Sequence, residues 1–363
     1  MDDRHPELCI HNSGTPDTRF VREILAQPAA LRIVTEFYRS SEGRALLREA
    51  AGIMLAKRRI IFTGMGTSFH APYLILHELA VIPQTVEIRD AGELLHFGLA
   101  GVRGDDVLIA ISQSGESAET RNAFGKLKGK VPVIAVVNNT ASFMGKNADL
   151  VIPLHAGEEA SISAKTYTNT LAVLLLLSTA LRGENISGET DTFRSIADLM
   201  EARMEETAER AREAADFLGG LCAFHAIARG SDLVTAEQLA LIVKEGAGIF
   251  GEALSGGLFR HGPLELAGPD YAAVCFLSRG NEPSLTASLA CELAAAGSRV
   301  LVAADSPYPC GSEVRTVVIE SPEPRSFPLL CAPFIELLVH EAAKLRGREA
   351  GAFRRIGKVT DRE

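Results

Sequence analysis

The 363-residue chain contains no tryptophan, only five tyrosines and no excess of basic residues. The missing indoles argue against a lectin-like module that stacks sugars on exposed tryptophans. Asp and Glu (46) outnumber Lys and Arg (37), which gives a net charge of −9. An acidic chain without long Lys/Arg runs is not expected to bind nucleic acid or an anionic membrane.

The chain also lacks Cys-x-x-Cys pairs and long apolar runs. Its six cysteines are therefore predicted to be reduced, buried thiols of a cytoplasmic protein. The start of the sequence, Met1–Arg4, is polar and no apolar run follows it, so no signal peptide is predicted. The longest apolar stretch, Leu171–Leu177, is too short to cross a bilayer and is predicted to lie in a buried core helix.

Four apolar segments recur in the same order in the two halves of the chain, with a nearly constant offset. Gly66 and Gly230 are 164 residues apart, and Gly115 and Gly280 are 165 residues apart. In the first half the segments are Arg59–Ser68, Asp106–Ser112, Val131–Val137 and Leu150–Pro153, and in the second half they are Cys222–Ser231, Ala272–Ser278, Arg299–Ala303 and Thr316–Ile319. Apolar strands that alternate with helical patterns are typical of parallel sheets covered on both faces. The sequence therefore predicts an α/β fold with two tandem, doubly wound parallel-sheet domains that arose by duplication.

Helical periodicity is expected at His70–Leu79 and Thr235–Glu245 after the first strand of each half, and in a charged connecting helix at Ile196–Phe217. The predicted division of the chain is an N-terminal extension with helices (1–47), a first domain (48–182), a linker with the connecting helix (183–217), a second domain (218–345) and a C-terminal tail (346–363).

Two hydroxyl-rich turns follow predicted strands of the first half. They are Gly66-Thr67-Ser68 and the segment from Ser112 to Ser117. In a parallel sheet, ligands bind beyond the carboxyl ends of the strands. Hydroxyls and backbone N–H groups at helix starts can hold a phosphate without a basic side chain, although such residues also serve as ordinary helix caps. Two such turns on neighbouring strands favour an anion site, and neither has the glycine pattern of a dinucleotide or ATP site.

The second half has no such density of hydroxyls and carries a different pair of candidates. Glu245 lies near the end of an apolar helix, where burial could raise its pKa toward that of a useful base. His261 precedes a Gly-Pro dipeptide that holds it in a rigid turn. A surface carboxylate and a loop histidine are the alternatives that these residues alone leave open.

These motifs resemble the double-domain sugar isomerase (SIS) family, which includes the isomerase half of glucosamine-6-phosphate synthase. The resemblance covers nearly the whole chain, from Arg19 to Lys358, and the interval of 16 residues from Glu245 to His261 is the interval found in the family. It implies two flavodoxin-like SIS domains that bind a sugar phosphate. The residues that match the family's phosphate-binding positions are Thr67, Ser68, Ser112, Gln113, Ser114 and Ser117.

The same resemblance implies the catalytic residues. Glu245 matches the base that moves a proton between C1 and C2 of the sugar. His261 matches the histidine that opens the sugar ring and that reaches in from a neighbouring subunit, which implies a homodimer with shared active sites. Lys358 matches the tail lysine that meets the open-chain sugar, although Gly351 and Phe353 depart from the family's usual Asp and Pro. The residues that match the sugar-contacting positions are Gly66, Glu158 and Ser163.

The predicted reaction is conversion of glucosamine 6-phosphate to fructose 6-phosphate with release of ammonia. The family's synthases carry a glutaminase domain, and too few residues precede the first SIS half here to form one, so glutamine is not expected as the nitrogen donor. Galactosamine 6-phosphate as substrate, a fructosamine 6-phosphate deglycase, a plain phosphosugar isomerase and a non-catalytic sugar-phosphate sensor are the alternatives.

One carboxylate suffices for such an isomerisation, so no cofactor and no metal are expected, and the remaining histidines show no ligand spacing. The only predicted partners are the small-molecule sugar phosphate and a second copy of the chain.

Overall fold

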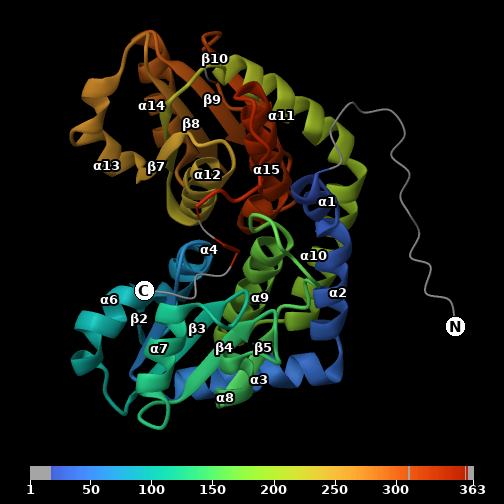
Figure 1. The fold of residues 1–363 in the computed structure, drawn as a ribbon, viewed down its shortest axis with the longest axis vertical. Helices are drawn as coiled ribbons and strands as arrows, with labels where there is room; N and C mark the ends of the chain where they lie inside the picture. Colours follow the sequence, from blue (N-terminus) through green and yellow to red (C-terminus); the bar gives the residue numbers. More distant parts are fainter. Residues whose placement is uncertain (1–17, 310, 356, 359–363) are drawn as a thin grey trace, which may run out of the picture.

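The computed structural model describes residues 18–309, 311–355 and 357–358, which form two lobes, each built around a five-stranded parallel sheet (Figure 1). The strands of the first sheet are β1 (Arg59–Gly64), β2 (Thr85–Asp90), β3 (Asp106–Ser112), β4 (Val133–Val137) and β5 (Leu150–Pro153). Those of the second sheet are β6 (Ala223–Ala228), β7 (Phe250–Ser255), β8 (Ala272–Leu277), β9 (Arg299–Ala304) and β10 (Val314–Val318).

The two sheets have equivalent topologies. The strand order is β2-β1-β3-β4-β5 in the first sheet, and β10-β9-β8-β6-β7 in the second, which is the same order counted from the opposite edge. Every strand pair is parallel. The predicted α/β class with two tandem parallel-sheet domains is therefore confirmed.

Apolar segments of the sequence form the central strands of the two sheets. Every residue of β1, β3, β4 and β8 is buried, as expected for strands covered by helices on both faces. Each sheet also contains one strand that the sequence did not predict, β2 or β7. Both lie at sheet edges, are only partly buried and contain charged or polar residues, so they lack the continuous apolar run of a central strand. Their first residues, Thr85 and Phe250, are 165 residues apart and thus follow the same offset as the predicted strands.

Helices surround the first sheet and connect it to the second. In this part of the chain they are α1 (Arg19–Leu25), α2 (Gln27–Arg39), α3 (Ser41–Leu55), α4 (Thr67–His70), α5 (Tyr73–Leu76), η1 (Glu78–Val81), α6 (Ala91–Glu93), η2 (Leu94–Gly98), η3 (Leu99–Gly101), α7 (Ala118–Leu127), α8 (Phe143–Asn147), α9 (Lys165–Leu181), α10 (Ile186–Ala202) and α11 (Met204–Leu218).

The second lobe contains fewer helical segments. They are η4 (Gly230–Asp232), α12 (Leu233–Gly246), α13 (Gly256–Arg260), η5 (Pro263–Leu266), α14 (Pro283–Ala295), η6 (Pro324–Ser326) and α15 (Phe327–Leu345). Helix α12 packs on the second sheet, on the side of the lobe that faces the first, and contacts α4 of the first lobe (Figure 1).

Two predicted helices are divided in the structure. The segment His70–Leu79 is not one helix, because α4 ends at His70 and Pro72, which has no amide hydrogen, precedes α5. The predicted helix Ile196–Phe217 breaks at Arg203, whose backbone leaves the helical conformation between α10 and α11. Helix α10 also begins earlier than predicted, at Ile186, where Asn185 caps it by accepting a hydrogen bond from the Ser187 amide.

The core helices explain the apolar runs. Leu171–Leu177 lies in α9 and is completely buried, which confirms the predicted core helix. A second helix, Pro324–Leu345, has the length and apolar composition of a membrane span, but 89% of its most apolar window is buried inside the protein, as expected of a core helix. Cys331 on α15 is buried as predicted, whereas Cys222 is exposed, and Cys9 and Cys310 lie outside the described residues.

Candidate active site

The turn after β3 carries serine hydroxyls that accept hydrogen bonds from the amides of the turn itself. Ser112 is buried, and its Oγ accepts a hydrogen bond from the Gly115 amide at 3.0 Å. The Oγ of Ser114 accepts from the Glu116 amide at 3.1 Å. Ser117 occupies the N-cap position of α7, but its side chain makes no capping hydrogen bond. Its hydroxyl therefore does not serve as an ordinary helix cap.

Gly115 is required at the centre of this turn. Its φ of 68° is in the left-handed region, and an added Cβ would lie 2.0 Å from Oγ of Ser142. The turn is therefore held tightly against the start of α8, and the hydroxyls on either side of Gly115 have a fixed position.

The turn after β1 approaches the same place from the neighbouring strand. Gly66 has a φ of 52° and turns the chain into α4, which begins at Thr67. The Oγ1 of Thr67 donates a hydrogen bond to Oε1 of Gln238 on α12, at 2.9 Å. The second lobe thus contacts the first at this turn.

Most of the predicted site residues line one pocket between the lobes. Its lining consists of Met65, Gly66, Thr67, Ser68, Gln113, Ser114, Ser117, Ser161, Ile162, Ser163, Leu241, Glu245, Phe353, Gly357 and Lys358. This group combines the two hydroxyl-rich turns, the loop before α9, the end of α12 and the C-terminal tail. The sequence predicted all of these segments, but only the tertiary structure brings them together.

Glu245 is the carboxylate of this pocket. It lies in the last turn of α12 and is half-buried. Burial raises the pKa of Glu245 above its ordinary value, while the positive charges of Lys358 and Lys244 lower it. A carboxyl group with a raised pKa beside a pocket lined by hydroxyls has the properties of a general base.

Lys358 reaches the pocket from the tail and is held there by Glu159. Its Nζ lies 2.8 Å from Oε2 of Glu159, whose side chain is completely buried. Glu159 also accepts hydrogen bonds from the amides of Ala164 and Thr166 and from the Thr166 hydroxyl. Glu159 was not among the predicted site residues, because nothing in the sequence shows which of the two adjacent glutamates, Glu158 or Glu159, points inward.

Three predicted residues lie elsewhere. Glu158 is 87% exposed and pairs with Arg19 at 3.0 Å, so it does not line the pocket. Ser112 lies beneath the turn and supports it through Gly115 and Ser117. His261 is exposed beyond the end of α13 and does not line the pocket of its own chain.

The loop that precedes α9 is anchored from the opposite side by α1. The buried carboxylate of Glu23 accepts hydrogen bonds from the amides of Ala160 (2.8 Å) and Ser161 (3.1 Å). Because Ser161 and Ser163 line the pocket, Glu23 fixes part of its wall.

The equivalent edge of the second sheet carries a buried carboxyl group. There the buried Asp232 accepts hydrogen bonds from the Ser278 hydroxyl, at 2.8 and 2.9 Å to its two oxygens. Burial raises the pKa of Asp232 to about 7. A carboxylate thus occupies the turn that corresponds to Thr67-Ser68 in the first lobe.

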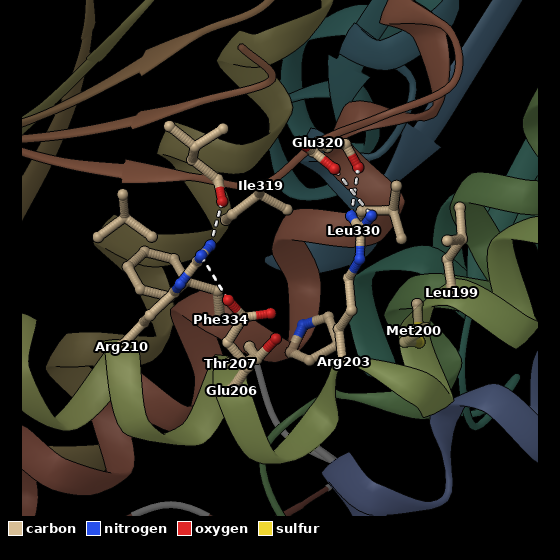
Figure 2. A pocket seen from close by; sticks show the side chains of 13 residues that line it. Leu199, Met200, Arg203, Glu206, Thr207, Arg210, Ile319, Glu320, Leu330 and Phe334 are labelled. Carbon is tan, nitrogen blue, oxygen red and sulfur yellow. Dashed lines mark hydrogen bonds and ion pairs between the residues drawn. The ribbon is translucent and has the colours of Figure 1, made fainter. Parts of the chain in front are cut away.

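A second pocket lies between α10, α11, β10 and α15 (Figure 2). Figure 2 shows two arginines at its rim, and both are already paired. Arg203 contacts Oε2 of Glu320 at 2.9 Å, and Arg210 contacts Oε1 of Glu206 at 2.5 Å. None of the predicted site residues lines this pocket.

Within the described part of the chain, no group of three or more His, Cys, Asp or Glu side chains is arranged to hold a metal ion. The polar groups that line the pocket between the lobes include several hydroxyls, the carboxyl group of Glu245 and the amine of Lys358.

The comparisons with known proteins agree with this architecture. Residues 53–180 match the family model of the SIS domain. The chain is 32% identical over 360 residues to the glutamine–fructose-6-phosphate aminotransferase [isomerizing] of Aeropyrum pernix, covering 93% of this chain and 56% of that relative. The chain thus spans little more than half the length of the curated relatives it matches.

Solved structures show the same fold. The C-terminal domain of glucosamine-fructose-6-phosphate aminotransferase from Francisella tularensis has a TM-score of 0.82 at 20% identity, covering 92% of this chain and 98% of that one. A glucosamine-6-phosphate deaminase from Thermotoga maritima has a TM-score of 0.73 at 19% identity, covering 94% and 99%. The protein is a SIS-domain protein, homologous to the isomerase portion of the aminotransferases.

Proposed function

We propose that the pocket between the lobes binds a sugar phosphate and isomerises it, with Glu245 as the base. The observation that carries this proposal is the convergence of Glu245, Lys358 and the two hydroxyl-rich turns on one pocket. Hydroxyls and backbone amides at the carboxyl edge of a parallel sheet suit a phosphate. A half-buried carboxylate whose pKa is raised suits the transfer of a proton between neighbouring carbons.

The particular reaction that we propose is deamination of glucosamine 6-phosphate to fructose 6-phosphate. Glu245 removes the proton from C2 of the open-chain sugar and returns it to C1, while the aldehyde oxygen at C1 gains a proton and the C2 nitrogen loses one. The C1 aldehyde thereby becomes a hydroxymethyl group and the C2 amine becomes an imine. Water then adds to the imine carbon, and ammonia leaves as the ketone forms, so one water is consumed for each ammonia released. The names of the matched aminotransferases and of the structurally similar deaminase support an amino-sugar phosphate as the substrate class.

Ring opening is assigned to His261 of a second copy of the chain. His261 is exposed and lies outside the pocket of its own chain, so its role requires a partner subunit. Leu258 and Leu266, which flank it on α13 and η5, are 63% and 55% exposed. Exposed apolar side chains beside a predicted catalytic histidine support a homodimer with shared sites.

The test is to incubate the purified chain with glucosamine 6-phosphate and to measure ammonia and fructose 6-phosphate. We expect equal amounts of both, and a loss of about 10²–10⁴-fold in the Glu245→Gln variant. Glu209→Gln, which changes an exposed carboxylate on α11, is the matched control and should keep full activity.

Other outcomes would point to the alternatives. Isomerisation of a sugar phosphate without ammonia release would show a plain isomerase, and activity on fructosamine 6-phosphate alone would show a deglycase. Tight binding of sugar phosphates without any turnover would favour a sensor and would contradict the role of Glu245.

A further inference from the structure

The orientation of the buried side-chain amide of Gln238 determines whether the Thr67 hydroxyl can donate or only accept a hydrogen bond in the pocket. Gln238 lies on α12 and is completely buried. Its Nε2 lies 3.4 Å from the Ser163 carbonyl oxygen, and its Oε1 lies 2.9 Å from Oγ1 of Thr67. A backbone carbonyl can only accept a hydrogen bond, so the NH₂ end of the amide must face Ser163. The amide oxygen therefore faces Thr67.

The amide oxygen in turn fixes the hydroxyl hydrogen of Thr67. An amide oxygen only accepts, so the single hydrogen of the Thr67 hydroxyl points to Gln238 and away from the pocket. Thr67 still lines the pocket, and what it presents there is the lone pair of its oxygen. Thr67 is consequently a hydrogen-bond acceptor toward any ligand.

In the turn after β3, by contrast, the Ser114 hydroxyl can donate a hydrogen bond to a ligand. The Oγ of Ser114 accepts from the Glu116 amide, so its hydrogen remains available to donate into the pocket. Phosphate oxygens accept hydrogen bonds, and they are therefore matched by Ser114 and not by Thr67.

The geometry points to a division of the pocket in which the Gln113–Ser117 turn holds the phosphate and Thr67 accepts a hydrogen bond from a hydroxyl or amino group of the sugar. This inference rests on the proposed function, because it assumes a sugar phosphate in the pocket. It moves Thr67 from the predicted phosphate contacts to the sugar contacts, and it makes Gln238 the residue that positions Thr67.

The experiment compares two probes by titration calorimetry: inorganic phosphate, and glucitol 6-phosphate, an open-chain sugar phosphate that cannot be isomerised. The variants are Thr67→Val, which removes the hydroxyl and keeps the shape, Thr67→Ser, which keeps the hydroxyl, and Ser114→Ala. Binding rather than turnover is measured, so the result does not depend on which reaction the protein catalyses.

We expect Thr67→Val to weaken glucitol 6-phosphate binding by about tenfold and to leave the dissociation constant of inorganic phosphate within about twofold, whereas Thr67→Ser should resemble the wild type. Ser114→Ala should weaken both probes. Equal weakening of both probes by Thr67→Val, or an unchanged affinity for glucitol 6-phosphate, would overturn the division of the pocket while leaving the sugar-phosphate site intact. Failure of the wild-type protein to bind either probe would overturn the proposed function and this inference with it.

Discussion

The Nζ atom of Lys358 lies 2.8 Å from Oε2 of Glu159, and this ion pair ties the C-terminal tail to the loop that precedes α9. Glu159 is completely buried and Lys358 is 19% exposed, so water screens the pair only weakly. The same pair holds Lys358 beside Glu245. The tail therefore contributes both to the wall of the pocket and to its electrostatics.

Replacing Glu159 by Gln is expected to release the tail and to destabilise the protein by about 3–5 kcal/mol, because the variant loses the charge that pairs with Lys358 and one acceptor for the Thr166 donors. Urea denaturation measures the stability, and limited proteolysis reports on the tail. Glu158→Gln, at the exposed neighbouring position, is the control and should change stability by less than about 1 kcal/mol. Equal behaviour of the two variants would contradict the buried pair.

Removing the charge of Lys358 is expected to raise the pKa of Glu245 further. Burial raises this pKa, and of the two lysines that lower it Lys358 has the larger effect. In Lys358→Met the effect of burial is therefore opposed only by Lys244. A base is active only when ionised, so the acid limb of the pH profile should move to higher pH. The carboxyl carbon resonance of Glu245, assigned with the Glu245→Gln variant, can be titrated by NMR even if Lys358→Met is inactive. Lys358→Arg keeps the charge and should keep the pKa; an unshifted titration in Lys358→Met would refute the coupling.

Asp232 is expected to make stability fall as pH rises. Its pKa is about 7 in the folded protein against an ordinary value of 3.8, because burial disfavours the ionised form. Between these two pH values the folded state binds more protons than the unfolded state, so stability decreases with rising pH and levels off above pH 7. Asp232→Asn removes this pH dependence. The free energy of unfolding of the variant minus that of the wild type should therefore be about 2–4 kcal/mol larger at pH 8 than at pH 4. Thermal unfolding at the two pH values provides the measurement, and a constant difference between the proteins would speak against it.

Arg325 joins the two halves of the chain by an ion pair that is largely shielded from water. Its Nη2 lies 3.0 Å from Oε2 of Glu78 on η1, and its Nη1 lies 3.0 Å from Oε2 of Glu189 on α10. Arg325→Met would leave both carboxylates without this partner and should cost about 3–5 kcal/mol. Arg315→Met, which breaks the exposed pair with Glu213, is the control and should cost less than about 1 kcal/mol in the same urea titration. Equal losses would show that the buried position is unimportant.

Mixing two inactive variants tests whether His261 acts in a neighbouring subunit. Glu245→Gln and His261→Asn should each be inactive alone. If a dimer shares its sites, each mixed dimer contains one site in which both residues are intact, so an equal mixture should regain about a quarter of the wild-type activity. Activity is measured after the mixture has been allowed to exchange subunits, with size-exclusion chromatography to verify the dimer. No recovery in exchanged dimers would place His261 outside the neighbour's site.

The sequence alone was sufficient to predict the architecture, because the buried central strands can be recognised from their runs of apolar residues. In β3, for example, every residue from Val107 to Ile111 is apolar, as a central strand of a parallel sheet requires. The edge strands β2 and β7 escaped prediction because half-exposed strands need no such run. The same local reasoning found the Ser112–Ser117 turn and Glu245, whose residue types stand out in the sequence.

Only the tertiary structure decided which of these residues meet, since contacts between distant segments leave no local signal. It placed Glu159 rather than Glu158 against Lys358, and it excluded His261 from the pocket of its own chain. It also brought Gln238, 171 residues from Thr67, into hydrogen-bonding distance of that hydroxyl. The sequence shows that a hydroxyl is present at Thr67; its hydrogen-bond polarity depends on a partner that folding brings from the other half of the chain.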